Sequence, residues 1–527
     1  PSLNIARVPQ NGRNFESFGE DPLLQGIMGS AYSATTQDYG GVISNQQNIA
    51  AYTQETNRLQ GLNNVMDERT LQEIYTRPFA IAIEGSHPGS VMCGFNQVNG
   101  EQSCDSGYLL NEILKTQLVP AMGCTEPIAV AYAAAVARRE LGALPEKAEI
   151  VGSGNIIKNV KSVVVPNTGG LRGLAAAAAA GIIAGDPDAQ LQVISKATAD
   201  DHAKIAAYLK SADFPIRESD SGYIFDIDIR LYAGSDSARC RIAGYHTNII
   251  RVEKNGEILR DVPYTEAGQN YATDRSLLNI EQIVEFSDSV DLDDVRPTLD
   301  RQIQYNLAIA KEGLTGNYGA RIGQVLLRSY GNDVHVRAKA WAAAASDARM
   351  NGCSLPVVIN SGSGNQGITC SVPVLIYAEE LGVSDELKLR ALTVSNLITT
   401  HLKTGIGRLS AYCGAISAGV GAGAGITYLY GGKHKEIAHT IVNALAIDSG
   451  IICDGAKSSC AAKIASAGEA GLLGMEMYKH GSQFYGGDGI VTKGVENTIK
   501  NVGRLAKYGM AQTDKEIIDI MISDPNS

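Results

Sequence analysis

The hydrophobic and polar positions follow a short period in the middle of the chain and a longer one in its last third. Stretches rich in β-branched or alternating residues predict strands at residues 148–154, 161–166, 222–234 and 238–253, and the KNGE that follows predicts a hairpin turn. From about Val334 onward, apolar residues at helical spacing predict helices separated by glycine-rich breaks. We therefore expect an α+β fold, with a mixed α/β domain at residues 107–335 and an all-α domain at residues 336–527.

Two predicted helices bear on how the chain packs. Thr125 is a suitable N-cap, with Glu126 and Pro127 in the first turn and an apolar body after them. The stretch at residues 410–432 has no charged residue and is long enough to span a bilayer. Glycine and alanine dominate it, so its insertion into a membrane would be weakly driven. We therefore interpret it as a buried, closely packed helix.

Composition and charge narrow the possible functions. The 527 residues are 44% hydrophobic and 19% charged, which is typical of a globular protein of about two to four domains. A net charge of −11 argues against a nucleic-acid-binding protein and against a basic membrane-surface protein. Nine cysteines in this length exclude a small disulfide-stapled secreted domain and leave a metal or redox role open. We expect no signal peptide, because the first residues have no basic and apolar segments.

Three cysteines stand in contexts that suit a ligand. Cys124 comes directly before a predicted helix, whose free N–H groups and dipole would stabilise a thiolate. Cys413, in RLSAYCG, and Cys453, in IICDGAK, are also flanked by small or turn-forming residues that let a bulky inorganic group approach the backbone. None of the three belongs to a CxxC pair, and taken alone each fits a buried structural cysteine better. Cys460 competes with Cys453 for any ligand role.

Three polar or glycine-rich clusters offer binding groups. The SGSGNQG of residues 361–367 precedes a predicted helix, so its N–H groups would cradle a carboxylate or a phosphate. The same cluster would suit the phosphate of pyridoxal phosphate, but that interpretation needs a Schiff-base lysine, which the sequence does not single out. The candidate residues of the three clusters are Asn155, Lys158, Asn159, His246, Thr247, Asn248, Ser361, Ser363, Asn365 and Gln366.

These clusters occur in an order that resembles a known family. The resemblance rests on VPAMGCTEP, NIIKNVKSVVVPNTGG, GYHTNI, SGSGNQGIT, LKTGIGRLSAYCG, IICDGAKSSCAAK, GGDGIV and GMAQTDKEIIDIM. From about residue 113 to the C-terminus, the chain resembles the L-cysteine desulfidases, relatives of the iron–sulfur-dependent L-serine dehydratases. The resemblance implies a [4Fe–4S] cluster held by Cys124, Cys413 and Cys453, with one iron left open and with Cys460 not a ligand.

The resemblance also implies the reaction. The open iron would bind the thiolate leaving group of L-cysteine while a base removes the Cα proton, giving hydrogen sulfide, pyruvate and ammonia without pyridoxal phosphate. Lys403, Ser361 and His246 are the candidate catalytic groups, and the other cluster residues would bind the substrate. L-serine dehydration is the alternative reaction. We also expect a homo-oligomer in a reducing cytoplasm, with no nucleic-acid or membrane partner.

Residues 1 to about 115 resemble a different family. Their resemblance to an internal piece of a family-three glycoside hydrolase, the β-glucosidase type, rests on NIARVPQNGRNFESFGEDP, QETNRLQ, MDERTLQEIY and GSVMCGFNQVNGEQSC. It implies a partial (β/α) barrel at residues 1–106. Arg13 matches a sugar-binding arginine of that family. The family's nucleophile strand is missing, and its Lys-His-Phe run is replaced by Gln47, Asn48 and Ile49.

Two cysteines of this segment, Cys93 and Cys104, fall where secreted relatives of the glycoside hydrolase carry cysteines, and the resemblance implies that they are able to pair. We expect the segment to be inactive as a β-glucosidase, because it lacks the nucleophile and two sugar ligands. A natural fusion and an assembly artefact both remain open as its origin.

Overall fold

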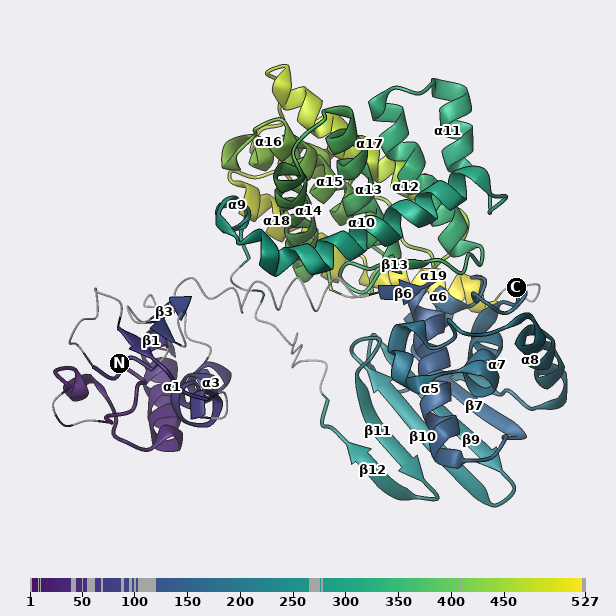
Figure 1. Ribbon diagram of the computed structural model, residues 1–527, viewed down its shortest axis with the longest axis horizontal. Helices are drawn as coiled ribbons and strands as arrows, with labels where there is room; N and C mark the ends of the chain where they lie inside the picture. The colour runs from purple at the N-terminus through teal and green to yellow at the C-terminus, as the bar shows by residue number, and fades with distance from the viewer. Residues whose placement is uncertain are drawn as a thin grey trace. The chain divides into compact units, whose positions relative to one another are not determined.

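The computed structural model describes residues 2–523 except 8, 10, 39–43, 50, 55–61, 68–69, 87–89, 94–96, 99–100, 103–119, 265–274, 276–277 and 408 (Figure 1). The chain divides into two compact units, Pro1–Leu110 and Asn111–Ser527. The domain boundary predicted at residues 106–107 lies outside the described residues. The division predicted at residues 335–336 falls at the start of the helix α12 (Val334–Met350).

The smaller unit combines helices with short strands. Its elements are η1 (Asn14–Glu16), α1 (Pro22–Asp38), β1 (Asn45–Ile49), β2 (Asn63–Asn64), η2 (Leu71–Tyr75), α3 (Arg77–Ser86), β3 (Ser90–Cys93), β4 (Gln97–Val98) and β5 (Glu101–Gln102). α1 packs against α3, and Leu3, Phe79 and Ala82 form a small core. β1 and β3 pair in parallel with α3 between them in sequence, which is the arrangement of a β/α repeat.

The smaller unit exposes several apolar side chains of α1 on its surface. Five large apolar side chains of α1 are 44–55% exposed, namely Leu23, Leu24, Ile27, Met28 and Tyr32. The partial (β/α) barrel implied by the resemblance stays a prediction.

The sugar-binding arginine implied by the resemblance is engaged by its neighbours. Arg13 forms an ion pair with Glu16 at 2.7 Å and donates to Gln47 Oε1 at 3.1 Å. Cys93 is the last residue of β3, whereas Cys104 lies outside the described residues. Pairing of these two cysteines therefore stays a prediction.

The larger unit contains a six-stranded sheet. Its strands are β7 (Lys147–Gly152), β8 (Ile216–Glu218), β9 (Asp226–Ala233), β10 (Asp236–Ala243), β11 (Ile249–Lys254) and β12 (Glu257–Asp261). Their order is β12-β11-β10-β9-β7-β8, antiparallel throughout except between β7 and β8. The predicted hairpin turn is confirmed between β11 and β12, where Asn255 and Gly256 have φ of 50° and 83°, as a type I′ turn requires.

One predicted strand of this region is wrong. Residues 161–166 form turns, and their only bridge among the described residues joins Val164 to Arg172. The valines are buried as a strand would bury them, but Pro166 and Gly170 turn the chain back before a ladder can extend. Burial and strand formation are therefore separate outcomes of the same apolar pattern.

Helices cover one face of the sheet. They are α5 (Thr125–Leu141), α6 (Gly154–Val160), α7 (Gly173–Ala184), η3 (Pro187–Gln192) and α8 (Ala199–Ser211). α5 packs on β9 and β10, and α7 packs on α5. Along β9, the fully buried Ile229 and Leu231 alternate with Asp228 and Arg230, which form an ion pair with each other.

The rest of the larger unit is mostly helical, and the strand β13 (Pro356–Val358) departs from the all-α domain predicted at residues 336–527. Its elements are α9 (Ile280–Ser289), α10 (Leu292–Thr315), α11 (Ile322–Tyr330), α12, α13 (Gly364–Glu380), α14 (Asp385–Ile406), α15 (Gly414–Leu429), α16 (His434–Asp448), α17 (Cys460–Lys479), α18 (Val495–Arg504), η4 (Leu505–Gly509) and α19 (Ala511–Ser523). A two-stranded antiparallel sheet, β6 (Pro120–Met122) with β13 (Pro356–Val358), ties this region to the start of α5.

The uncharged stretch at residues 410–432 is confirmed as a buried helix. α15 packs against α13, α14, α16 and α17 (Figure 1). A Cβ at Gly419 would overlap the Ala467 carbonyl of α17, so glycine allows the two backbones to approach each other. Among the helices that the structure describes, none is long and apolar enough to cross a membrane.

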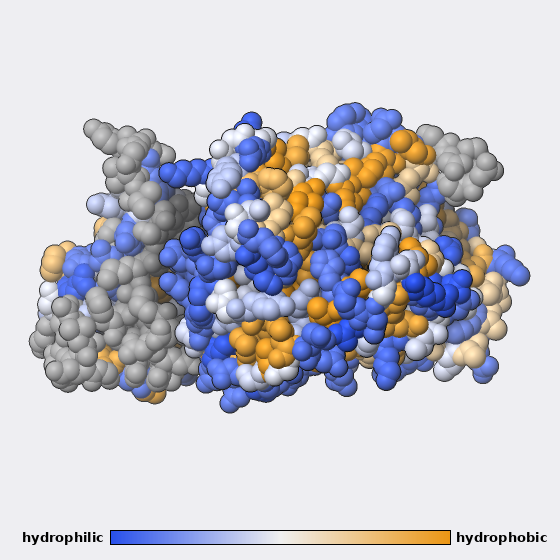
Figure 2. Space-filling view, turned by 90° about the horizontal axis from the view of Figure 1, so that it is seen from above, coloured by the Kyte–Doolittle hydropathy of each residue, from blue (hydrophilic) through white to orange (hydrophobic). Residues whose placement is uncertain are grey.

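Apolar residues also gather on part of the outer surface. Figure 2 shows bands of apolar residues between hydrophilic ones on the face of the larger unit that it displays. Exposed large apolar side chains of the helical region include Val325, Tyr330, Leu473 and Tyr485. The homo-oligomer expected from the family resemblance stays a prediction.

Candidate active site

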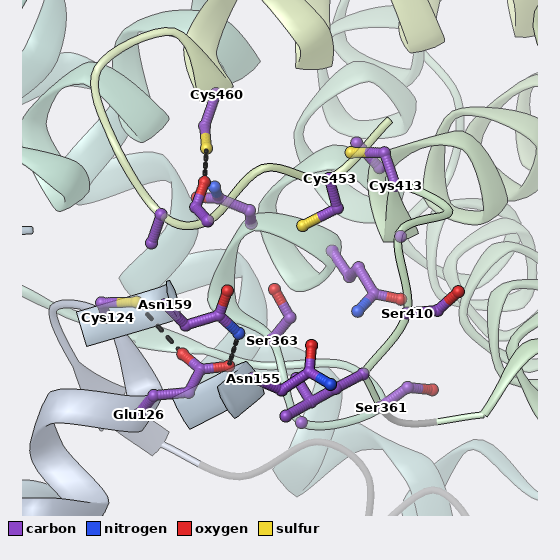
Figure 3. A pocket seen from close by; sticks show the side chains of 18 of the residues that line it. Cys124, Glu126, Asn155, Asn159, Ser361, Ser363, Ser410, Cys413, Cys453 and Cys460 are labelled. Atoms are coloured by element: carbon purple, nitrogen blue, oxygen red, sulfur yellow. Dashed lines mark hydrogen bonds between the residues drawn. The ribbon is translucent and has the colours of Figure 1, made fainter. Parts of the chain in front are cut away.

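One cavity of the larger unit gathers most of the residues that the sequence singles out (Figure 3). It has a volume of about 110 Å³. Its lining includes twelve of the predicted site residues: Cys124, Asn155, Lys158, Asn159, His246, Ser361, Ser363, Asn365, Gln366, Lys403, Cys413 and Cys453. The sheet region and the helical region both contribute to it, so the site forms only when the larger unit folds as a whole.

Two predicted binding residues do not line this cavity. Thr247 and Asn248 lie in the turn between β10 and β11, on the same GYHTN cluster as His246. The Asn248 side chain donates to the Ala243 carbonyl at 2.8 Å and closes that turn. Asn248 therefore shapes the turn that carries His246.

Besides the seven-residue α6, four helices begin at the cavity: α5, α13, α15 and α17. In none of them does the N-cap side chain accept a hydrogen bond from the first turn. A side-chain cap is present at α8, α9, α10, α12 and α14 but is also absent at α7, α11 and α18, so its absence is not peculiar to the cavity. Uncapped N–H groups and the positive ends of four helix dipoles favour anions, so the cavity suits thiolates and carboxylates.

The start of α5 differs from the prediction by one residue. Cys124 is the N-cap, and Thr125 is already the first helical residue. The Thr125 hydroxyl does not cap the helix because it donates to the Gly362 carbonyl at 3.0 Å. This bond joins the start of α5 to the SGSGNQG loop.

Cys413 and Cys453 lie on neighbouring loops. An antiparallel bridge joins Tyr412 to Ile452; the Cys413 N–H donates to the Ile451 carbonyl, and the Cys453 N–H donates to the Ala411 carbonyl. Burial and the nearby charge of Cys453 raise the pKa of Cys413 to about 12. Iron would reverse this preference, because a metal ion stabilises the thiolate that it binds.

Cys124 and Cys460 line the same cavity from other directions (Figure 3). The Cys124 thiol donates to Glu126 Oε2 at 3.1 Å, and Cys460 packs beside the buried cluster of Cys124, Val163 and Met350. The Cys460 thiol donates to the Gly455 carbonyl at 3.8 Å. Burial raises the pKa of both thiols.

The chemistry of these donors fits an iron–sulfur cluster. Within the described part of the chain, no three His, Cys, Asp or Glu side chains lie close enough to hold one metal ion. A [4Fe–4S] cluster makes a different demand, because each thiolate binds a different iron and the sulfurs stand farther apart. Four thiols line one cavity, and three of them stand at the first or N-cap position of a helix, so the donor atoms present are of the type that iron binds.

Glu126 and His246 form a buried acid–base pair. Glu126 Oε1 lies 3.7 Å from His246 Nε2 and accepts from Asn159 at 3.4 Å. Burial opposes ionisation of this carboxyl, but its interactions with the nearby His246 imidazole and the Cys124 thiol outweigh burial and lower the pKa of Glu126 to about 2. The His246 imidazole also packs edge-on against Phe225. The ring thus packs on Phe225, while its Nε2 has no hydrogen-bond partner among the described residues.

The two predicted lysines have different surroundings. Lys158 is buried and forms an ion pair with Asp514 of α19. Lys403 is equally buried, yet it has no carboxylate partner among the described residues. Burial lowers the pKa of Lys403 to about 8, although the charges of Cys453 and Cys413 oppose this. Lys403 thus gives up its proton more readily than an ordinary lysine.

The SGSGNQG loop is tightly folded. Ser361 and Gly362 have φ of 48° and 82°, and the backbones of Asn360 and Ser363 exchange two hydrogen bonds. A Cβ at Gly362 would come within 3.1 Å of the His246 ring, so glycine lets the loop lie against the imidazole. The Ser361 hydroxyl donates a hydrogen bond to Asn360 Oδ1 at 2.8 Å.

Sequence reasoning misses three residues of this site. Glu126 has the pattern of a first-turn helix residue, and Arg349 is one of many charges on an alanine-rich helix. Asp514 lies in the GMAQTDKEIIDIM piece, where the sequence suggests no role for it. The available signal was the GCTEP motif itself, in which a carboxylate follows a candidate ligand by two residues.

Comparison with known proteins divides the chain as the structure does. The model of the glycosyl hydrolase family 3 N-terminal domain matches residues 1–119. β-Glucosidase 3B of Thermotoga neapolitana is 40% identical over 22% of this chain and 16% of its own, with a TM-score of 0.21. The β-glucosidase of Kluyveromyces marxianus is 36% identical over 22% of this chain and 14% of its own, also with a TM-score of 0.21. The chain thus spans less than a fifth of either β-glucosidase.

The larger unit has relatives that it matches almost from end to end. A UPF0597 protein of Desulfitobacterium hafniense is 60% identical over 79% of this chain and 96% of its own length. Another, from Lachnoclostridium phytofermentans, is 49% identical over 78% of this chain and 99% of its own length. The model of the serine dehydratase alpha chain matches residues 188–519, which include Cys413, Cys453 and Lys403. The chain therefore belongs to the serine dehydratase alpha chain family.

Proposed function

We propose that this protein is a [4Fe–4S]-dependent L-cysteine desulfidase, a lyase that converts L-cysteine to hydrogen sulfide, pyruvate and ammonia without pyridoxal phosphate. The observation that carries the proposal is the cavity itself, where four thiols and four uncapped helix N-termini meet. Soft donors suit iron, and the helix ends suit the anionic groups that a cluster and an amino acid bring with them.

Cys124, Cys413 and Cys453 would hold the cluster. The backbone pairing of the Cys413 and Cys453 loops favours these two as a set. Both remaining thiols donate within the protein, Cys124 to Glu126 and Cys460 to the Gly455 carbonyl, so the choice of Cys124 over Cys460 rests on the family resemblance. When bound through three thiolates, the cluster supplies a Lewis-acidic iron with affinity for a thiolate leaving group. Such an iron is sensitive to air, which is why we place the enzyme in a reducing cytoplasm.

Lys403 is our choice for the base that removes the Cα proton. Its amine lines the cavity without a carboxylate partner in the described chain, and burial disfavours its charged form. As Lys403 takes the proton, the Cα–H electrons form the Cα=Cβ bond, and the sulfide leaves with the electrons of the Cβ–S bond. The aminoacrylate that remains becomes an imine and hydrolyses to pyruvate and ammonia.

The other cavity residues hold the substrate and keep its surroundings fixed. His246 is paired with Glu126, so we assign it a positioning role beside the SGSGNQG loop. Asn155, Asn159 and Gln366 each keep one buried side-chain oxygen without a hydrogen-bond partner. Oxygens left in this way accept from donors such as the ammonium of an amino acid.

L-Serine dehydration is the second candidate, favoured by the family model that matches most of the larger unit. The two reactions share the Cα proton transfer and differ in the leaving group. A thiolate binds iron more strongly than hydroxide and leaves more easily, so we place cysteine first.

The test is an anaerobic assay of the iron-reconstituted protein with L-cysteine, with L-serine and with an aryl β-glucoside. We expect sulfide and pyruvate in equal amounts from L-cysteine. A kcat/KM for serine tenfold or more above that for cysteine, which is about 1.4 kcal/mol in transition-state terms, would make the protein a serine dehydratase. Glucoside hydrolysis without sulfide release would point to the smaller unit as the enzyme. Bound iron with no product from any substrate would indicate a binding protein.

A further inference from the structure

Arg349 is a buried cation to which the proposed reaction assigns no role. It lies in the last turn of α12, its side chain is 2% exposed, and it lines the cavity. One guanidinium nitrogen donates to Asn365 Oδ1 at 3.0 Å, while Nε has no hydrogen-bond partner. No carboxylate among the described residues forms an ion pair with it. Burying a guanidinium without an opposite charge is unfavourable, because its hydration is lost and no ion pair replaces it.

A second positive group lies against the same guanidinium. A Cβ at Gly364 would overlap Arg349 Nε, so the first residue of α13 leaves room for the guanidinium at that helix's N-terminus. The N-cap Ser363 does not bond to the first-turn N–H groups. The guanidinium and the positive end of this helix are adjacent in a buried site and repel each other, and an anion bound beside both would offset that repulsion.

The nearby carboxylates are committed elsewhere. Glu126 is paired with His246, and Asp347 accepts from the Ile322 N–H at 2.6 Å. The remaining anions that enter this cavity are the thiolates and the substrate. A planar guanidinium beside backbone N–H groups matches the two oxygens of a carboxylate, whereas a thiolate sulfur uses only one such direction.

We propose that Arg349, together with the first turn of α13, binds the α-carboxylate of the substrate, which limits this site to β-substituted α-amino acids with a free carboxylate. The inference rests on the proposed function, because it assigns the anion to an amino-acid substrate. Decarboxylated or esterified analogues lose this anchor even when their thiol and amine are unchanged.

Two small thiols test the contribution of the carboxylate to binding separately from that of the amine. 3-Mercaptopropionate has the thiol and the carboxylate, and cysteamine has the thiol and the amine. We would titrate each into the anaerobic, iron-reconstituted full chain and measure the heat of binding. For the unmodified protein we expect 3-mercaptopropionate to bind at least tenfold more tightly than cysteamine. In Arg349→Met we expect its affinity to fall by about 100-fold, the usual cost of losing a charge-assisted hydrogen-bonded pair, with cysteamine changed less than about twofold.

Arg337→Met is the matched control. Arg337 lies on the same helix and pairs with Glu380, away from the cavity lining. It should leave both affinities unchanged. Arg349→Lys keeps the positive charge but loses the planar guanidinium. Its affinity for 3-mercaptopropionate should lie between those of the unmodified protein and Arg349→Met. This variant also keeps the test available if Arg349→Met does not fold.

Several outcomes would overturn the inference. Equal affinity of the unmodified protein for the two thiols would do so without any variant. So would an Arg349→Met protein that loses iron but keeps its preference for 3-mercaptopropionate, because Arg349 would then serve the cysteines. Failure of the proposed function has a different signature, since absence of turnover with cysteine and serine leaves the binding preference and its dependence on Arg349 intact.

Discussion

Asp514 holds Lys158 in the cavity from the far end of the chain. Asp514 Oδ1 lies 2.5 Å from Lys158 Nζ, and its Oδ2 accepts from Asn155 at 2.9 Å. Figure 1 shows α19, which carries Asp514, beside α6, which carries Lys158 and Asn155. One carboxylate of the last helix therefore fixes two side chains that line the site.

Replacement of Asp514 should weaken both folding and substrate binding. Asp514→Ala leaves the Lys158 ammonium buried without its partner, which we expect to lower the free energy of unfolding by about 3 kcal/mol. Asp514→Asn keeps the shape and removes the charge, and we expect it to raise KM for L-cysteine about tenfold while iron content stays constant. Asp519→Asn, at an exposed position of the same helix, is the control. Equal behaviour of the two asparagine variants would show that Asp514 has no positioning role.

The assignment of Cys124, Cys413 and Cys453 as cluster ligands predicts the effects of four single cysteine substitutions. Changing Cys124, Cys413 or Cys453 to alanine should abolish the brown iron–sulfur absorbance and sulfide release, because each removes one of three ligands. Cys460→Ala should leave both largely intact. Iron content and visible absorbance, measured anaerobically, report on the cluster independently of activity. If Cys460→Ala bleaches the protein and Cys453→Ala does not, the third ligand is Cys460.

The local pattern of the sequence predicts a helix well where the residues of that helix alone determine where it begins. The helix α12 begins at Val334, where the helical pattern of the sequence also begins, because an alanine-rich helix with an Asp333 N-cap needs no tertiary information to begin. The strand predicted at residues 161–166 is wrong for the opposite reason. Their burial depends on a turn formed by Pro166 and two glycines, and a window of six residues does not show whether a partner strand exists.

The site is harder to predict than the fold, because distance along the chain hides its contacts. Lys158 and Asp514 are separated by 356 positions, and no local pattern relates them. The cysteines were found through family motifs, since spacing alone leaves each as an ordinary buried thiol. Arg349 was missed because an arginine on a helix is usually solvated, and only the fold shows that this one is buried.

A pH dependence of stability should arise from Asp347. Burial raises the pKa of this carboxyl to about 6, against the hydrogen bonds it accepts from backbone N–H groups. The unfolded carboxyl titrates near 3.8, so the folded state binds more protons between these values and its stability falls as pH rises through that window. Asp347→Asn removes the cost and should be more stable than the unmodified protein by about 1–2 kcal/mol at pH 7.5. At pH 4 the advantage should largely vanish; an advantage independent of pH would contradict the assignment. Denaturant unfolding at both pH values measures it.

The smaller unit should be dispensable for the lyase. The relative from Desulfitobacterium hafniense is matched over 96% of its length by 79% of this chain, so that protein lacks a counterpart of the first hundred residues. Every cavity residue lies at or after Cys124, and the smaller unit has a core of its own around Leu3 and Phe79. A chain without residues 1–98 should therefore bind iron and release sulfide with a kcat/KM within about twofold of the full chain. Iron content, solubility and sulfide release of the two proteins, prepared side by side, make the comparison. A shortened chain that is insoluble while the full chain is active would show that the larger unit needs the smaller one to fold.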